Sequence, residues 1–333
     1  MTINGSRFGV LRASSLALTL VILFSMLATV LEPALAASLG PARADSATSV
    51  EGQQLRASKQ NKEKQKTRGV EPEVIGGSGV NQGRYTFMAY VNAGDFQCGG
   101  SLVAPSFVMT AAHCATEDGS TTEISADAFT IGIGKANLGQ LGAGYVWSVV
   151  DVTVHPDWDP GTFENDVAIL ELNSPVPAAI AAPIPIVGKG VFGWDEAGTG
   201  AVVAGWGETE RGYSSNQLLE ANLRPVGDGG CKVAYGGEMY SGVMICATNQ
   251  GKDSCYGDSG GPLFVKEVIG SITKKKKHKK GKNRKKKRVP IYRETQTGIV
   301  SWGNECADPN FPGVYTRLSA PGINDFVIGA INN

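Results

Sequence analysis

The stretch Lys252–Pro262, KDSCYGDSGGP, places one serine among three glycines, with one aspartate directly before the serine and another six residues upstream. Glycine adopts tight turns that strain other residues, so Ser259 can lie on a sharp bend with its hydroxyl accessible. Crowded or buried aspartates are costly unless each has a partner. The stretch therefore raises two questions: what activates the serine, and what do the aspartates bind?

The rest of the chain predicts an all-β fold. Its 333 residues are 42% hydrophobic, enough for one or two domains with proper cores. Short β-type runs recur between turn residues, and 44 glycines favour a barrel or sandwich. Apolar residues with helical spacing near the end predict an amphipathic C-terminal helix. The β-type runs are residues 129–134, 145–154, 166–172, 201–207, 297–303 and 313–318, and the helical positions are Ile323, Phe326, Val327, Ala330 and Ile331.

The N-terminal region reads as a secretory leader. Arg7 and Arg12 precede an apolar run from residue 16 to 31, and Ala34-Leu35-Ala36 fits a signal peptidase site. We therefore predict a signal peptide over residues 1–36 and a secreted, extracellular protein; the alternative is an uncleaved membrane anchor. Residues 37–73 are polar and predict a pro-segment, and a composition shift begins a globular domain over residues 74–333.

Six cysteines remain in the part beyond the leader, an even number that suits disulfides in an oxidising compartment. Six cysteines allow 15 pairings, and spacing alone does not choose among them. A zinc site is the competing interpretation, but the chain has no CxxC pair and its three histidines lie far apart, so we predict no metal. The cysteines are Cys98, Cys114, Cys231, Cys246, Cys255 and Cys306, and the histidines His113, His155 and His278.

The zero net charge of the chain hides a strong asymmetry. Residues 74–333 hold 22 Lys and Arg and 25 Asp and Glu, and 12 of those bases lie in Lys274–Arg288, KKKKHKKGKNRKKKR, which has no acid. Without that run, 10 bases face 25 acids, a balance of −15. Like charges repel and nothing apolar packs there, so we predict a protruding disordered loop. It is either a tolerated solvated insertion or an electrostatic contact for an acidic polysaccharide, nucleic acid or anionic surface.

Three residues have the chemistry needed for nucleophilic catalysis. A serine hydroxyl needs a base to take its proton and a carboxylate to hold that base. The candidates are Ser259 in GDSGGP, His113 in TAAHC and Asp166 in NDVAILEL. Taken singly, each has an ordinary alternative: a structural histidine, an aspartate in a turn and a serine in a glycine-rich loop.

Together, TAAHC, NDVAIL and GDSGGP, in the order His, Asp, Ser, resemble the chymotrypsin-like (trypsin) serine protease family. VIGG, CGGSLV, AGWG, SWG and PGVYTRL support the resemblance, which runs from Val74 to the C-terminus apart from an insertion at about 266–296. It implies two six-stranded antiparallel β-barrels and a C-terminal α-helix, with His113 and Asp166 on the first barrel and Ser259 on the second. It implies no cofactor.

The resemblance also implies a role for each neighbouring site residue. The backbone N–H groups of Gly257 and Ser259 would bind the oxyanion, and Ser301 would support Asp166. Asp253 would form the floor of a pocket that selects Lys or Arg before the scissile bond. The substrate-binding residues are then Asp253, Ser301, Trp302, Gly303 and Gly313, with the two glycines on the pocket walls, and the implied disulfides are Cys98–Cys114, Cys231–Cys246 and Cys255–Cys306.

The second aspartate, Asp258, matches the family residue that pairs with a new N-terminal ammonium, here that of Val74, and the protein would be made as a zymogen. Val74 follows Glu73 rather than a basic residue, so we expect another protease to activate it. TIGIGKANLGQLG lacks the paired acids of a calcium loop. The predicted protein is a monomeric trypsin-like endopeptidase; the alternative is a catalytically weak relative that binds polyanions through its Lys-rich loop.

Overall fold

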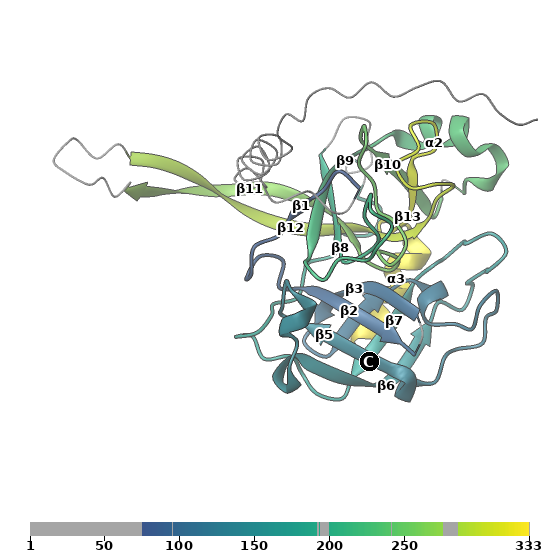
Figure 1. Ribbon diagram of the computed structural model, residues 1–333. Helices are drawn as coiled ribbons and strands as arrows, with labels where there is room; N and C mark the ends of the chain where they lie inside the picture. The colour runs from purple at the N-terminus through teal and green to yellow at the C-terminus, as the bar shows by residue number, and fades with distance from the viewer. Residues whose placement is uncertain are drawn as a thin grey trace, which may run out of the picture. The chain divides into compact units, whose positions relative to one another are not determined.

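The computed structural model describes the protein over residues 75–94, 96–191, 193, 200–240, 242–275 and 286–332 (Figure 1). The predicted signal peptide 1–36, the predicted pro-segment 37–73, Val74 and the centre of the basic run, residues 276–285, lie outside the described residues. Among the helices that are described, none has the length and apolar character needed to cross a bilayer.

The first half of the domain closes into a six-stranded antiparallel barrel. Alternation forms its walls: in the strand that begins at Val146, Trp147 and Val149 are buried while Val146, Ser148 and Val150 are exposed. This period of two places every second side chain in the barrel core. Around the barrel the strands are β2 (Met88–Ala93), β3 (Phe96–Ala104), β4 (Phe107–Thr110), β7 (Ala168–Leu172), β6 (Val146–Val154) and β5 (Phe129–Ile133).

The second half forms another six-stranded barrel, closed by the pairing of β8 with β9. In β9, Leu219, Ala221 and Leu223 point inward between more exposed neighbours, again with a period of two. The short β1 (Ser78–Gly79) adds to the outer edge of β9. Around this barrel the strands are β8 (Ala201–Gly205), β9 (Leu219–Pro225), β10 (Met244–Thr248), β13 (Gly313–Arg317), β12 (Lys286–Trp302) and β11 (Pro262–Lys275).

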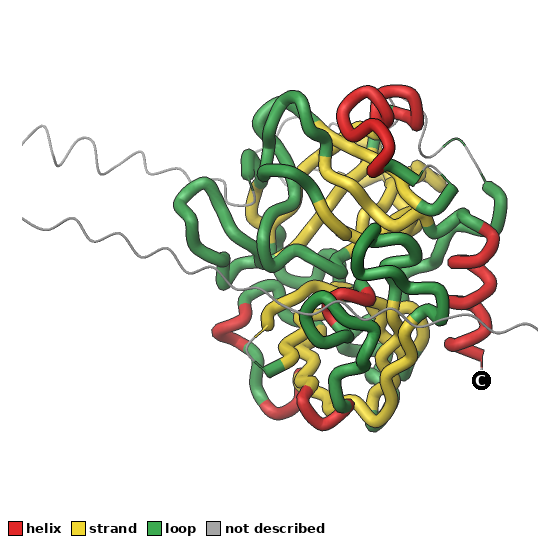
Figure 2. The backbone as a smooth tube through the Cα atoms, turned by 90° about the vertical axis from the view of Figure 1, so that its right-hand side faces the viewer, coloured by secondary structure: helices red, strands yellow, loops and turns green. Residues whose placement is uncertain are grey.

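The C-terminal helix α3 (Pro321–Asn332) joins the halves, since it follows β13 of the second barrel and packs on the first. Its Ile323 and Val327 are fully buried in the core that contains the first barrel, and Figure 2 shows the strands in two groups with α3 beside them. The predicted two-barrel fold and terminal helix are confirmed, as are all six predicted β-type runs. Helix α2 (Gly227–Tyr235) was not predicted, because its glycines mask a helical pattern.

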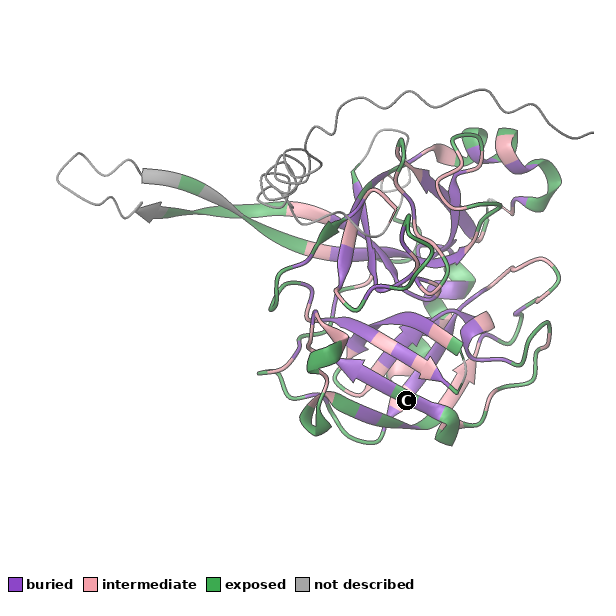
Figure 3. Cartoon of the chain, viewed as in Figure 1, coloured by how far each residue is buried: buried purple, intermediate pink, exposed green. Residues whose placement is uncertain are grey.

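The prediction of a disordered loop over Lys274–Arg288 is wrong at both ends of that run. β11 and β12 continue out of the barrel as a two-stranded antiparallel ribbon, and backbone pairing extends to Lys274 with Lys287 and Lys275 with Lys286. The physical reason lies in the preceding residues: β-branched side chains favour strands, and Glu267 forms an ion pair with Arg293 across the ribbon. Figure 3 shows the change from buried residues in the barrel to exposed residues on the ribbon.

Candidate active site

Asp166 is the centre of a hydrogen-bond network between the barrels. It lies in the loop before β7 and is fully buried. Its Oδ1 accepts from the backbone N–H of His113 (2.9 Å), and its Oδ2 lies 2.8 Å from His113 Nδ1. Ser301 Oγ, from β12 of the second barrel, donates to the same Oδ2 (2.6 Å). These contacts fix the ring orientation and place the Nδ1 proton on the side of Asp166, which leaves Nε2 as the available base.

His113 lies on a short 3₁₀ turn, η2 (Ala112–Cys114), directly after β4. Burial lowers the pKa of His113, but the charge and hydrogen bond of Asp166 raise it by more than burial lowers it. The pKa of His113 is therefore above its ordinary value. The Asp166 carboxylate thus stabilises the imidazolium form. Phe163 packs against the ring of His113, with 5.7 Å between the ring centroids.

Ser259 lies in a turn held by two glycines with positive φ, Gly257 (+88°) and Gly260 (+79°). A Cβ on Gly260 would come within 2.2 Å of Thr110 Oγ1, so no larger residue fits there. The carbonyl of Ser259 accepts from Gly99 N–H in the first barrel (2.7 Å). This close packing of the turn on β3 and β4 brings the serine to the histidine.

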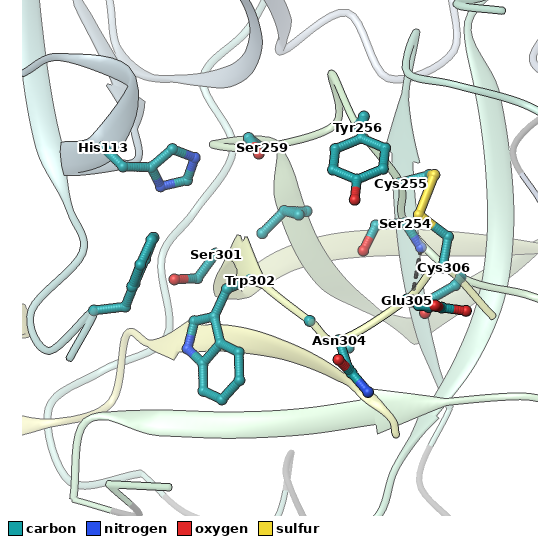
Figure 4. Close-up of a pocket in the computed structure, with 15 residues that line it drawn as sticks. His113, Ser254, Cys255, Tyr256, Ser259, Ser301, Trp302, Asn304, Glu305 and Cys306 are labelled. Carbon is teal, nitrogen blue, oxygen red and sulfur yellow. Dashed lines mark hydrogen bonds between the residues drawn. A yellow bond between two sulfur atoms is a disulfide. The ribbon is translucent and has the colours of Figure 1, made fainter. Parts of the chain in front are cut away.

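Ser259 and His113 face the same cavity of about 260 Å³ (Figure 4). Among the described residues no hydrogen bond joins the two side chains; hydrogen bonds between catalytic groups often form only when a substrate binds. The cavity contains most of the predicted site residues, and Val74 alone lies outside the described residues. The site residues predicted from the sequence that line this cavity are His113, Asp253, Ser259, Ser301, Trp302, Gly303 and Gly313.

Asp253 is buried within this cavity, with 3% of its surface exposed. Its carboxylate accepts from the backbone N–H groups of Ser254 (2.9 Å) and Ala307 (3.0 Å). Burial raises the pKa of Asp253 to about 6, although these hydrogen bonds oppose the shift. No lysine or arginine is among the described residues that line the cavity, and His113 is paired with Asp166, so the negative charge of Asp253 is available to a cation that enters it.

Two glycines keep the cavity open toward Asp253. A Cβ on Gly313 would lie 2.8 Å from Asp253 Oδ1, and a Cβ on Gly303 would face the Cα of Gly313 at 3.9 Å. The disulfide Cys255–Cys306 joins the segment of Asp253 to that of Gly303, both of which line the cavity. A long side chain can therefore extend to the carboxylate.

Asp258 occupies a different, fully enclosed position beside Ser259. Its carboxylate accepts from the backbone N–H groups of Gly207 (2.9 Å) and Cys255 (3.0 Å). The glycines of AGWG make this space: a Cβ on Gly205 would lie 2.0 Å from Asp258 Oδ1. Burial raises the pKa of Asp258 to about 6, and no cation among the described residues pairs with it.

The residue after Val74 already contacts this region. The carbonyl of Ile75 accepts from Asp253 N–H (3.3 Å), and Gly76 N–H donates to the carboxylate of Glu210. The start of the domain therefore lies against the loop that carries both aspartates. Glu210 and these contacts were not predicted from the sequence.

Several cavity residues were also missed. Phe163, Tyr256, Asn304 and Glu305 line the cavity, but the sequence pattern assigns a role to none of them, although Tyr256 lies in the stretch Lys252–Pro262. Phe163 has a positive φ of +58°, a strained backbone that no local pattern indicates. A second cavity, of about 380 Å³, also contains His113 and Ser259 and extends to Glu117 and Asp118.

The cysteines are all paired, in the three combinations that the family resemblance implies. The structure joins Cys98–Cys114, Cys231–Cys246 and Cys255–Cys306. Within the described residues, one group of potential metal ligands lies close together: Cys98, Cys114 and His113. Its two sulfurs form a disulfide, so they are not available as thiolate ligands.

On two packed β-barrels, a histidine that a buried carboxylate orients toward a serine defines the class of serine endopeptidases, which are hydrolases. The chain belongs to this class through the trypsin family, whose model matches residues 74–327. The family predicted from the sequence motifs is thereby confirmed.

The similar proteins are proteases by name. A trypsin-like protease of Streptomyces glaucescens is 33% identical over 256 residues, which are 75% of this chain and 80% of that protein. A trypsin of Saccharopolyspora erythraea is 32% identical over 256 residues, 74% of this chain and 94% of that protein. Human serine protease 56 is 33% identical over 251 residues, 74% of this chain, but this match spans only 37% of that longer protein.

Proposed function

We propose that the protein is a secreted endopeptidase that cuts peptide bonds after Lys or Arg. One observation carries this proposal: buried Asp253, without a described cationic partner, lines the cavity that Ser259 and His113 share. A Lys or Arg side chain supplies the missing positive charge and the hydrogen-bond donors. The secretory leader predicted over residues 1–36 supports an extracellular location.

The proposed reaction follows from the orientation of His113. As Ser259 Oγ attacks the carbonyl carbon, its proton passes to His113 Nε2, and Asp166 stabilises the imidazolium. The carbon–nitrogen bond then breaks as His113 returns the proton to the leaving amine. Water attacks the acyl-enzyme in the same way, giving its proton to His113, which restores it to Ser259. The backbone N–H groups of Gly257 and Ser259 bind the oxyanion between these steps.

The substrate backbone is proposed to pair with residues 301–303 at the end of β12. Ser301, Trp302 and Gly303 border the cavity beside Ser259, so an added strand there presents its scissile carbonyl to the hydroxyl. The glycines 303 and 313 admit the long basic side chain, and Asp253 receives its charged end.

The zymogen proposal rests on Asp258. Cleavage before Val74 would create an ammonium group next to Ile75, which already contacts the loop of Asp253. This ammonium would pair with Asp258 and order the Gly257 turn, which forms half of the oxyanion site. Because Glu73 precedes the cut, a protease of another specificity performs it. A secreted enzyme with an N-terminus other than Val74 would contradict this step.

The direct test is hydrolysis of peptide amides that differ only in the residue before the scissile bond. Protein that begins at Val74 is compared with uncut protein and with the Ser259→Ala variant of both. We expect turnover of Lys and Arg substrates, but not of Phe or Glu substrates, by the cut protein alone. Turnover by Ser259→Ala, or no turnover after correct cleavage, would refute the proposal.

The basic run favours one further contact, with polyanions. Twelve bases in 15 residues, on a chain that is otherwise acidic, suit an anionic partner. We propose that heparin retains the protein, and that deletion of residues 274–288 abolishes retention. Unchanged retention would disprove it. No turnover together with heparin binding would favour the alternative of a polyanion-binding relative without protease activity.

A further inference from the structure

Among the described residues, no second layer covers the ribbon formed by the outer parts of β11 and β12. β8 pairs with β11 only at Leu263 and Phe264, and β13 pairs with β12 only from Gly298 onward. Within the part of the chain that the structure describes, each strand of the ribbon beyond Glu267 and Arg293 is paired only with the other. Figure 1 shows the ribbon extending away from the second barrel. Its side chains therefore have no core of this domain to pack into.

Large apolar side chains are nevertheless concentrated on it. Their exposed fractions lie between 40% and 64%. Exposed apolar residues on a soluble domain are ordinarily scattered, and a contiguous group marks a contact surface. We call this group the apolar belt: Val268, Ile269, Ile272, Ile291 and Tyr292.

The register places the apolar belt on both faces of the ribbon. Val268 is opposite Tyr292, and facing residues share a face. The register shifts between Val268 and Gly270, so Gly270 is opposite Ile291, on the other face. A Cβ on Gly270 would contact Ile291 Cδ1 at 3.9 Å, which agrees with this placement. An apolar phase that surrounds the ribbon can cover the apolar side chains of both faces, whereas one flat protein surface would cover a single face.

The bases follow immediately beyond the apolar belt. Lys274, Lys275, Lys286, Lys287 and Arg288 continue the two paired strands. Apolar and aromatic side chains next to Lys and Arg are the combination that binds the interface of an anionic bilayer. Each base near such a surface strengthens the attachment, and buried apolar area adds to it. The remaining domain, with its balance of −15, is repelled by the same surface, so the attachment is directional.

Ion pairs and hydrogen bonds hold the end of the ribbon nearest the barrel. Lys266 Nζ lies 3.1 Å from Glu220 Oε2, to which Tyr85 OH also donates (2.5 Å), and Arg84 forms an ion pair with the same carboxylate. This partly buried network connects β11, β9 and the segment before β2.

We propose that the ribbon attaches the protein to bilayers rich in anionic lipid, with the bases at the phosphates and the apolar belt at the acyl boundary. This deepens the polyanion contact proposed above but is independent of catalysis. Nucleic acid or acidic polysaccharide would use the bases and leave the apolar belt without a role. Pairing of two ribbons edge to edge would bring two basic segments together and is opposed by their repulsion.

The test is co-sedimentation with lipid vesicles. Protein carrying Ser259→Ala, which cannot cut its own basic run, is mixed with vesicles of phosphatidylcholine alone or with added phosphatidylglycerol. We expect binding to the anionic vesicles only, weakened by salt. Changing the five strand bases to Gln should weaken binding to the anionic vesicles, because seven of the 12 bases in the run remain. The double variant Val268→Ser/Ile272→Ser should lower the partition coefficient about ten-fold or more, because apolar transfer is lost while charge is kept.

Matched controls separate this from misfolding and from the other partners. Val150→Ser and Val233→Ser remove exposed valines of the first barrel and of α2, and should bind like the parent. All variants should keep the parent melting temperature, since the replaced side chains lie outside the cores. Failure to bind anionic vesicles overturns the proposal. An unchanged partition coefficient for Val268→Ser/Ile272→Ser also overturns it, because the contact would then be purely electrostatic. Self-association of the protein that prevents vesicle binding overturns it as well.

Discussion

Ser301 Oγ donates a 2.6 Å hydrogen bond to Asp166 Oδ2, the same oxygen that contacts His113 Nδ1. Ser301 belongs to the second barrel and Asp166 to the first, so the bond crosses the boundary between them. The orientation of the histidine therefore depends on how the two barrels pack together.

Ser301→Ala should reduce kcat/KM about ten- to hundred-fold, the usual effect of removing a hydrogen bond to a charged group. The loss also leaves more of the Asp166 charge to act on His113, so the acid limb of the pH–rate profile should move to higher pH. Thr297→Val is the control, because it removes a buried hydroxyl of the same strand that bonds to Leu263 O instead. An equal shift in both variants would contradict the assignment.

Asp253→Ser should remove the preference for Lys and Arg substrates. A buried carboxylate that pairs with a bound cation is worth several kcal/mol, so kcat/KM for these substrates should fall by about 10²–10³ or more. Glu305→Gln tests a carboxylate at the exposed part of the same cavity, where screening keeps the effect within about three-fold. Comparable losses in the two variants would place the specificity elsewhere.

Binding of a small aromatic amidine such as benzamidine should depend on pH through Asp253. Its pKa of about 6 means that the carboxyl is neutral below pH 6 and charged above it. Affinity should therefore rise through about pH 6, with close to a ten-fold loss for each unit below it. Titration calorimetry across this range gives the profile, and Asp253→Asn should flatten it. A flat profile in the parent protein would show that the amidine binds without Asp253.

The uncut chain should be less stable at neutral pH than in acid, through Asp258. Its folded pKa of about 6 lies above the ordinary value of 3.8, so its contribution is fully present below about pH 3.8 and is lost as the pH rises through 6. The expected difference is about 3 kcal/mol for this group. Denaturant unfolding at several pH values measures it, and Asp258→Asn should remove that part of the slope.

Cleavage before Val74 should reverse this effect, because an ammonium partner lowers the pKa of Asp258 and stabilises its charged form. The cut protein should then be the more stable form at pH 8. Equal pH dependence of the cut and uncut forms would contradict the proposed ion pair.

Gly205→Ala should destabilise the protein by several kcal/mol, because the added Cβ would lie 2.0 Å from Asp258 Oδ1. Gly200→Ala is the matched control, since a Cβ there meets nothing within 4 Å. Its melting temperature should stay near that of the parent. If Gly205→Ala were equally harmless, the enclosed position of Asp258 would be wrong.

Much of the fold and site was predictable from local patterns. Alternating residues such as those of Val146–Val154 predict strands because burial in a sheet has a period of two. GDSGGP, TAAHC and NDVAIL carry Ser259, His113 and Asp166 in short stretches whose chemistry is recognisable without a structure. The ends of the ribbon were mispredicted as disordered from their charge. The neighbouring β-branched residues favour pairing of the two strands despite that charge.

What the linear order of residues specifies is therefore chemistry and local conformation: a serine on a glycine turn, a candidate base, a candidate carboxylate and the strands that carry them. Tertiary folding supplies what no local pattern contains. It buries Asp253 and Asp258 and so raises their pKa values, places Phe163 on His113, and leaves the apolar belt uncovered by any other described residues. Burial and contact arise between segments far apart in the chain, and for that reason they exist only once the barrels have closed and packed together.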